Sequence, residues 1–305
     1  PGMTEVGTVL IGFLAAAVRI STPLLLAATG ELINERAGVI NLGVEGAMLA
    51  GALGSALGAL AGGPWFGIVV AILAGMAVAA LFAAVAIGAR ADQIITGTAV
   101  TLASVGLTGA IARTAFGASG PGLSLPTFSV VSIPVLSAIP IVGPALFVQP
   151  LLSYLAWFLV PALWWFLFRT QPGLALRATG ESAESARAAG VPVRTVQTMA
   201  TLAGGALAGL AGATLVLAQV GTFAEKMTAG RGFIAIAIVV LGRWHPFGIL
   251  LAALFFGGAN ALQFALQAMG YSVPYQFFLM LPYLLALLGL AGAAGKARAP
   301  AGLGK

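Results

Sequence analysis

Three carboxylates, one arginine and two asparagines fall within residues 28–50, ATGELINERAGVINLGVEGAMLA, beside an apolar, glycine-rich segment. A second polar stretch, TGESAESARAAGVPVR at residues 179–194, lies between two long apolar segments. Charged side chains are expensive in a membrane unless they are paired or hydrated. The two stretches therefore mark helix ends and candidate functional sites in an otherwise apolar chain.

The composition is that of a membrane protein. Of the 305 residues, 60% are hydrophobic and only 7% are charged, whereas a soluble domain carries about 25% charged residues. Apolar runs of about 20 residues recur, which is the length of a membrane-spanning helix and excludes the alternating strands of a β-barrel. We therefore expect an all-α integral membrane protein that forms one polytopic domain over residues 1–305.

Nine apolar runs are candidate spans, which predicts nine or ten transmembrane helices including broken ones. They are residues 6–28, 39–62, 64–88, 93–112, 151–168, 193–219, 231–242, 246–268 and 274–293. The run 231–242 is short and bounded by glycines, so we expect a half-helix there. Residues 113–150 contain six prolines and cannot form one helix. We interpret them as an extracytoplasmic loop with short helices.

Small residues recur every fourth position in two spans. Gly46, Ala50, Gly54, Gly58 and Gly62 form one such stripe, and Gly205, Gly209 and Ala213 form another. Stripes of this kind let helix backbones approach closely in lipid. We interpret them as packing positions.

Basic residues predict the orientation, since cytoplasmic loops carry an excess of lysine and arginine. If the loop 169–194 is cytoplasmic, ten basic residues fall inside and three outside, with Arg19 within the first span. The inner ones are Arg36, Arg90, Arg169, Arg177, Arg187, Arg194, Arg243, Lys296, Arg298 and Lys305, and the outer ones are Arg113, Lys226 and Arg231. The N-terminus is then expected outside and the C-terminus inside.

Several kinds of chemistry are excluded by residue counts. The chain has no cysteine and one histidine, so we expect no metal site. Its net charge of +6 comes from basic residues that stand singly at the ends of apolar runs, which indicates membrane lipids and not nucleic acid as the neighbour. A membrane-embedded hydrolase would need a catalytic constellation that the sequence lacks.

The loop 169–194 contains a predicted helix. Glu181 and Glu184 lie near its expected start and Arg187 near its end, an order that suits the helix dipole, and Gly190 ends it. Its small residues suit docking into a groove of another protein. From the residues alone, a solvated linker helix fits equally well.

Motifs in this loop and elsewhere resemble those of one transporter family. The pattern G-E-x-x-x-x-A-R-x-A-G-V at residues 180–191, followed by a glycine-rich span, is similar to the coupling helix of ABC importer permeases for branched-chain amino acids, simple sugars and nucleosides. TPLLLAATGELINERAGVINLGVEGAMLAGA, at residues 22–52, resembles more specifically the nucleoside and simple-sugar permeases, above all the guanosine type. Further similar segments lie at residues 91–100, 106–109, 230–258 and 281–292.

The resemblance implies a role. In such importers two permeases form the pathway, two cytoplasmic ATPase domains bind their coupling helices, and a substrate-binding protein docks outside. The sequence has no GxxxxGK[ST] loop, so we expect no catalysis and no cofactor on this chain, with ATP and Mg²⁺ on the partners. We expect a heterodimer with a second permease in the bacterial inner membrane. The residues expected to contact the ATPase are Gly180, Glu181, Glu184, Arg187, Ala188, Ala189 and Gly190.

Polar residues within the spans are candidates for the substrate pathway. They are Asn41, Glu45, Thr101, Asn260, Gln263 and Phe264. Amides beside aromatic rings suit a neutral nucleoside or sugar, and interhelical hydrogen bonding is an equal alternative. Similar permeases often carry asparagine where this chain has Thr101, which leaves substrate specificity open.

The carboxylates of the first polar stretch also have alternatives. Glu45 is expected either to pair with Arg19 as a structural element or to face the pathway. Glu35 and Arg36 are expected either to pair with a residue of another element, such as Arg90 or Asp92, or to be interface charges that end a helix. We expect transport of a small polar solute, with a nucleoside first and a simple sugar second. An ion-coupled secondary transporter is a further alternative, for which Glu45 would be the coupling carboxylate.

Overall fold

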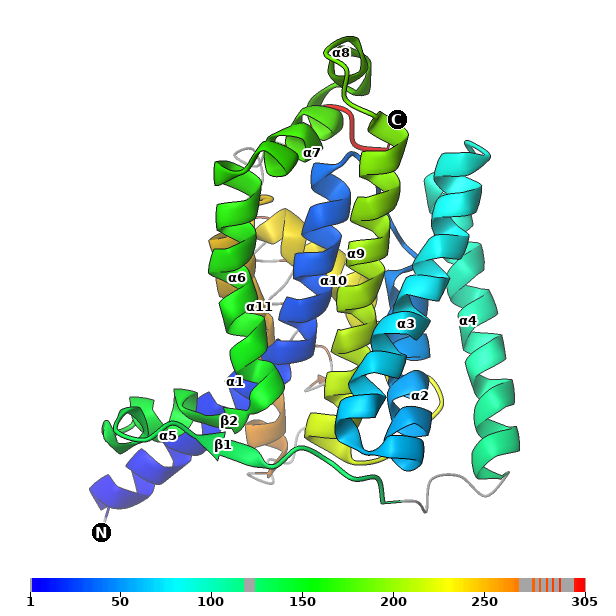
Figure 1. The fold of residues 1–305 in the computed structure, drawn as a ribbon. Coiled ribbons are helices and arrows are strands. Elements are labelled where there is room, and N and C mark those ends of the chain that lie inside the picture. Colours follow the sequence, from blue (N-terminus) through cyan, green and yellow to red (C-terminus); the bar gives the residue numbers. More distant parts are fainter. Residues whose placement is uncertain are drawn as a thin grey trace.

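The computed structural model describes residues 2–117, 124–268 and 299–304, and beyond Ala268 otherwise only residues 276, 277, 280, 284, 287 and 291. Within this part of the chain nearly every element is a helix, and the long helices lie side by side in a bundle (Figure 1). The predicted all-α membrane fold is confirmed.

Seven helices of the described residues are long and apolar enough to cross a membrane. They are α1 (Gly2–Arg36), α2 (Val44–Gly62), α3 (Pro64–Ala83), α4 (Gln93–Phe116), α6 (Leu151–Arg169), α9 (Val193–Thr214) and α11 (Pro246–Ala268). Turns of π-helix extend α3 through Ala84–Gly88 and α9 through Leu215–Val220. The short α10 (Arg231–Leu241) agrees with the expected half-helix. The predicted span 274–293 lies outside the described residues, apart from single positions.

The first helix is longer than its apolar run. α1 continues past residue 28 to Arg36, because the polar side chains of its last turns find partners inside the protein. Pro23 lies within α1 and cannot donate a hydrogen bond to the Arg19 carbonyl one turn earlier. The side chain of Gln219, in the π-helical turn after α9, donates to that carbonyl at 2.7 Å. The proline therefore creates an acceptor that ties α1 to α9.

Close packing of α2, α3 and α9 forms one side of the bundle, and α1 packs on α9 and α11. A Cβ added at Gly51 would lie 2.4 Å from the Gly209 backbone, and one added at Gly212 would lie 2.0 Å from the Met48 carbonyl oxygen. Gly54 and Gly58 face the α3 backbone in the same way. The predicted packing role of the small residues is confirmed.

We predict that Gly212→Ala lowers the free energy of unfolding by about 1–3 kcal/mol, because α2 and α9 must separate to admit the new methyl group. Thermal unfolding in detergent measures the effect. Gly106→Ala is the matched control, since nothing lies within 4 Å of a Cβ added at Gly106. Equal unfolding temperatures for the two variants would contradict the prediction.

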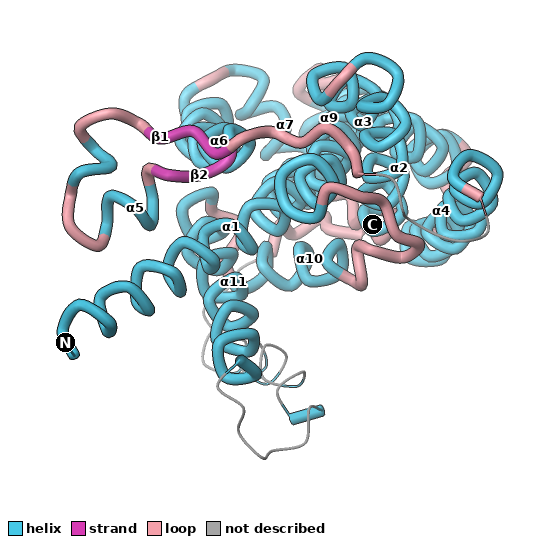
Figure 2. Tube along the Cα trace, turned by 90° about the horizontal axis from the view of Figure 1, so that it is seen from below, coloured by secondary structure: helices cyan, strands magenta, loops and turns pink. Residues whose placement is uncertain are grey.

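The proline-rich segment between α4 and α6 contains more than short helices. β1 (Val130–Ser132) pairs with β2 (Val148–Pro150) in an antiparallel hairpin that the sequence analysis did not predict. Between the strands lie a 3-10 turn, Leu136–Ala138, and the short helix α5 (Val142–Leu146). This segment projects from the bundle beside the N-terminal part of α1 (Figure 2).

The polar loop after α6 forms two helices instead of one. α7 (Gln171–Glu181) ends at Ser182, whose extended backbone and side chain cap the start of α8 (Ala183–Ala188). Glu181 therefore ends α7, contrary to the prediction that it begins a helix. Glu184 and Arg187 lie in the first and last turns of α8, and Gly190 ends this region at a positive φ of 86°, both as expected. α8 lies at the opposite end of the bundle from the N-terminus (Figure 1).

Candidate functional site

Glu45 lies in the first turn of α2, and both oxygens of its buried carboxylate accept hydrogen bonds. Its Oε1 accepts from the Thr228 hydroxyl at 2.6 Å and from the Gly230 N–H at 2.8 Å. Its Oε2 accepts from the Gly232 N–H at 2.7 Å. All three donors belong to the first turn of α10 or to the segment before it. We call these four residues the Glu45 junction.

The local sequence explains why a carboxylate fits here. The first N–H groups of a helix have no partner within the helix, and the helix dipole favours negative charge beside them. Gly230, the N-cap of α10, supplies no side-chain cap, and Glu45 takes that place. A Cβ at Gly232 would lie 2.6 Å from the Glu45 backbone, so only glycine permits this approach. The N-termini of α2 and α10 thus meet at one carboxylate.

The pairing of Arg19 with Glu45 is wrong for the described residues. The ion pair that they contain joins Arg113 to Glu225 at 3.5 Å. Glu45 is bound instead by neutral donors of the α10 segment, and the Nε of Arg19 is buried without a hydrogen-bond partner in this part of the chain. Glu45 therefore has a structural role, as one alternative predicted, but it joins α2 to α10 instead of pairing with Arg19.

Asn41 and Thr101 shape the segment that leads into α2. The Asn41 side chain accepts from the Gly43 N–H at 3.0 Å, and the Thr101 hydroxyl donates to the Leu42 carbonyl at 2.9 Å. This segment, residues 37–43, passes from the end of α1 into the bundle before α2 begins (Figure 1). Both predicted pathway residues are therefore buried beside the Glu45 junction and bind backbone groups.

A second polar cluster joins the end of α1 to the turn between α10 and α11. The Glu35 carboxylate accepts a hydrogen bond from the Trp244 indole N–H. Arg36 Nε donates to the Trp244 carbonyl at 2.9 Å. We call Glu35, Arg36 and Trp244 the Trp244 clamp. The prediction that these two side chains pair with Arg90 or Asp92 is wrong, because both bind Trp244 in the turn between α10 and α11.

Glu31, one turn before Glu35, joins the last turns of α1 to the segment that leads into α2. Its carboxylate accepts from the Asn34 amide at 2.9 Å and from the Asn41 N–H at 3.0 Å. Sequence analysis missed these partners and the Trp244 clamp. The tryptophan indole in GRWHPFG, a donor that needs an acceptor when buried, was the available signal.

The end of α7 lies against the end of α1. A Cβ at Gly180 would lie 2.2 Å from the Arg36 carbonyl oxygen. The described C-terminal residues also bind here, since the Gly302 N–H donates to the Gly180 carbonyl at 2.9 Å and the Gly304 N–H to the Gly38 carbonyl at 3.1 Å. Residues 299–304 therefore hydrogen-bond both to the end of α7 and to the segment that follows α1.

Comparison with known proteins places the chain in a family. The family described as the branched-chain amino acid transport system permease component matches residues 13–290. The chain belongs to this permease family. No solved structure matches it.

Similar proteins include three ABC transporter permeases. The permease is 43% identical to a putative glucose ABC transporter permease of Haloferax volcanii, over 85% of this chain and 78% of the relative. It is 36% identical to a guanosine ABC transporter permease of Bacillus subtilis, over 92% and 91%. It is 33% identical to a nucleoside ABC transporter permease of Lactococcus lactis subsp. cremoris, with the same shares. The permease is thus a multi-pass transport component.

The residues predicted to couple the permease to an ATPase differ in solvent exposure: one is buried and six are exposed. Gly180 is buried against the end of α1. The exposed ones are Glu181, Glu184, Arg187, Ala188, Ala189 and Gly190, while Ala186 anchors α8 by its buried side chain. α8 is therefore available for contact on most of its surface.

The predicted pathway residues of α11 lie apart from the Glu45 junction. Asn260 donates to the Phe256 carbonyl of its own helix at 2.9 Å, Gln263 is buried and Phe264 is exposed. α11 packs mainly on α1, α6 and α10, and no hydrogen bond of the described residues joins these side chains to α2 or α4. Their role in the pathway stays a prediction.

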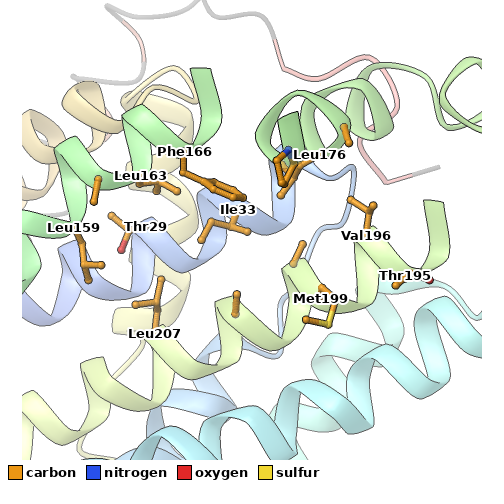
Figure 3. A pocket seen from close by; sticks show the side chains of 15 residues that line it. Thr29, Ile33, Leu159, Leu163, Phe166, Leu176, Thr195, Val196, Met199 and Leu207 are labelled. Atoms are coloured by element: carbon orange, nitrogen blue, oxygen red, sulfur yellow. The ribbon is translucent and has the colours of Figure 1, made fainter. Parts of the chain in front are cut away.

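An apolar cavity of about 490 Å³ lies between α1, α6, α7 and α9. Side chains of Ile33, Phe166, Leu176, Met199 and Leu207 project into it (Figure 3). Its walls are almost wholly hydrocarbon, so it offers a polar solute little to bind. The cavity lies directly beside α7, on the side of the bundle that carries α8.

Proposed function

We propose that the permease is the membrane subunit of an ABC importer for nucleosides. The matches to the guanosine and nucleoside permeases over nine-tenths of their length support this substrate. The observation that carries the importer role is the exposed α8 with its coupling-helix motif in a chain of this family. A simple sugar is the second candidate, which the 43% identity to the putative glucose permease favours.

We further propose its assembly and cofactors. A second, different permease completes the pathway, two ATPase subunits bind ATP and Mg²⁺ and contact α8, and a binding protein delivers the solute outside. The absence of a P-loop motif from the sequence supports the division of labour between chains. In this proposal the chain is one domain, binds no cofactor or metal of its own and catalyses no reaction.

The charge distribution supports an orientation with α8 in the cytoplasm and the N-terminus outside. Helix ends and turns on the α8 side of the bundle carry seven arginines, whereas Arg113 lies at the far end of α4, and Lys226 and Arg231 lie just before and at the start of α10. The seven are Arg36, Arg90, Arg169, Arg177, Arg187, Arg194 and Arg243. Cytoplasmic loops carry this excess of basic residues. α8 then projects toward the proposed ATPases.

The contacts described above suggest how α8 acts on the pathway. α7 lies against the end of α1 at Gly180 and Arg36, and the Trp244 clamp joins the end of α1 to the C-terminal end of α10. The Glu45 junction joins the other end of α10 to α2. A shift of α8 would thus reach α2 through a series of elements in direct contact, packed together at Gly180 and Arg36 and hydrogen-bonded at the Trp244 clamp and the Glu45 junction.

The apolar cavity gives α7 room for such a shift. Closely packed interiors resist displacement, whereas the space between α7, α6 and α9 allows side chains such as Leu176 and Phe166 to move. In this proposal the cavity changes shape during transport and holds no solute.

Transport by the assembled system tests the proposal. The permease is co-expressed with a second permease, the ATPases and the binding protein, and uptake of labelled guanosine is measured in competition with glucose. ATP-dependent guanosine uptake that glucose does not inhibit is expected. Uptake without any ATPase would overturn the importer role, and exclusive glucose uptake would overturn the nucleoside assignment.

We predict that the double variant Glu181→Ala, Glu184→Ala stays folded but loses about tenfold or more of its ATP-driven uptake, because an interface depends on a few central contacts. Both side chains are exposed, and the hydrogen bond that the Glu181 carboxylate accepts from the Ala301 N–H is a long, exposed one of 3.3 Å, so their loss changes stability little. Uptake and ATPase activity are measured together. Glu225→Ala, an exposed carboxylate at the opposite end, is the control, and normal uptake by the double variant would refute the role of α8.

A further inference from the structure

Two adjoining hollows open beside the N-terminal end of α9. One, of about 510 Å³, is polar and lies between α8, α9 and the turn from α3 to α4. The other, of about 440 Å³, is mostly apolar and lies between the end of α3 and α9, where Ala84 and Leu202 line it. Ile87 and Arg194 line both hollows, so the two lie side by side.

The polar hollow contains an excess of positive charge. Arg90, Arg187 and Arg194 line it, against one carboxylate, Asp92. The Asp92 carboxylate accepts from the Ile95 N–H at 2.8 Å as the N-cap of α4, and its single negative charge leaves the three arginines in excess. Within the described part of the chain no hydrogen bond or ion pair engages the three guanidinium groups.

The side-chain amides that line the polar hollow already form hydrogen bonds with backbone groups. Gln93 accepts from the Ile40 N–H at 2.8 Å, and Gln197 donates to the Ala37 carbonyl. Among the described lining residues, the side chains left for a ligand are therefore the three arginines, of which Arg187 is also an expected ATPase contact. Arginine binds phosphate through several donors in one plane. The polar hollow thus suits a phosphate group.

The arginines come from three separate elements. Arg90 lies in the turn before α4 at a positive φ of 60°, a conformation uncommon outside glycine, and Arg187 and Arg194 lie at the end of α8 and the start of α9. The fold therefore brings the three arginines of separate elements together at one opening.

We propose that the two hollows bind an anionic phospholipid, with its phosphate at the arginines and an acyl chain between α3 and α9. The apolar hollow favours a phospholipid over a free phosphate as the ligand, because a free phosphate would leave that hollow empty. α3 and α9 are membrane spans, and this opening lies at their ends, where a lipid headgroup lies. Anionic lipids are attracted by basic groups at the membrane surface. The leaflet concerned is the cytoplasmic one if the proposed orientation holds.

Native mass spectrometry of the assembled transporter in detergent tests this site. Phosphatidylglycerol, phosphatidylcholine with the same acyl chains, and inorganic phosphate are the three probes. Phosphatidylglycerol is expected to bind more tightly than phosphatidylcholine, and Arg90→Gln with Arg194→Gln should weaken its binding about 30-fold. The matched control removes two arginines outside the hollow, Arg169→Gln with Arg113→Gln, and should leave binding unchanged.

A second variant tests the acyl-chain part. Ala84→Phe fills the apolar hollow and should reduce binding of phosphatidylglycerol without removing an arginine. The proposal is overturned if inorganic phosphate competes fully with the lipid and Ala84→Phe has no effect, which would indicate a free-anion site. It is also overturned if the arginine variants keep the lipid but release the ATPase subunits, which would assign the hollow to a protein interface.

Discussion

Replacing Glu45 by alanine is expected to lower the free energy of unfolding by about 3–5 kcal/mol and to abolish uptake. The change leaves the Thr228 hydroxyl and the N–H groups of Gly230 and Gly232 without their acceptor in a buried site. Each unsatisfied buried donor costs about 1–3 kcal/mol. The start of α10 then loses its attachment to α2. Thermal unfolding in detergent and ATP-driven uptake measure the two effects.

Two further variants show which property of Glu45 matters. Thr228→Val removes one of the three donors and is expected to cost only about 1–2 kcal/mol. In the Glu45→Ala background the same change should cost less, because the donor is already unsatisfied there. Additive effects of the two changes would contradict the Glu45 junction. Glu225→Ala, which removes an exposed carboxylate, controls for the loss of charge.

Glu45→Gln separates a structural carboxylate from one that acts directly in transport. Glutamine keeps the size but has one acceptor oxygen, and its amide nitrogen faces N–H donors. If Glu45 acts by position, stability and uptake should fall together. Full stability with complete loss of uptake would show that the carboxylate acts on the solute or on an ion, and would contradict a purely positional role.

The membrane spans and some of the helix ends could be predicted from the sequence, because they depend on local composition. The half-helix α10, bounded by glycines, and the end at Gly190 were predicted correctly. The end of α1 was not, because an apolar run stops where charges begin. A helix, however, continues wherever its charges find partners, as Glu31 does with Asn34 and Asn41.

The partners of the buried carboxylates could not be predicted in this way. Glu45 and Thr228 are 183 positions apart, and Glu35 and Trp244 are 209 apart. Charge alone suggested Arg19 for Glu45, since an opposite charge is the obvious partner in a membrane. The structure uses backbone N–H groups and an indole instead. The backbone donors carry no sequence signature, because every residue except proline has an N–H.

The same reasoning explains why α10 is a discrete unit. It is too short to cross a membrane, and both of its ends depend on carboxylates from other helices. Glu45 of α2 binds its N-terminal end, and Glu35 of α1 binds the turn that follows it. A change in the distance between α1 and α2 must therefore move α10 or break one of these attachments.

Trp244→Phe is expected to lower the free energy of unfolding by about 2–3 kcal/mol and to uncouple ATP hydrolysis from uptake. Phenylalanine keeps the aromatic packing of a side chain that is 5% exposed but removes the N–H that binds the buried Glu35 carboxylate. The hydrogen bond from Arg36 to the Trp244 carbonyl remains between the end of α1 and the α10–α11 turn. Unfolding temperature, ATPase activity and uptake are measured on the same preparation.

A double-mutant cycle distinguishes the lost hydrogen bond from lost packing. Glu35→Met removes the buried charge, so Trp244→Phe should cost little more in that background. Trp165→Phe on α6 is the matched control, because Trp165 is 60% exposed and is not part of the clamp. If the double variant is stable yet still uncoupled, the clamp transmits motion and does not merely hold the fold together. If uptake stays coupled in all these variants, the route from α8 to the Glu45 junction does not pass through Trp244.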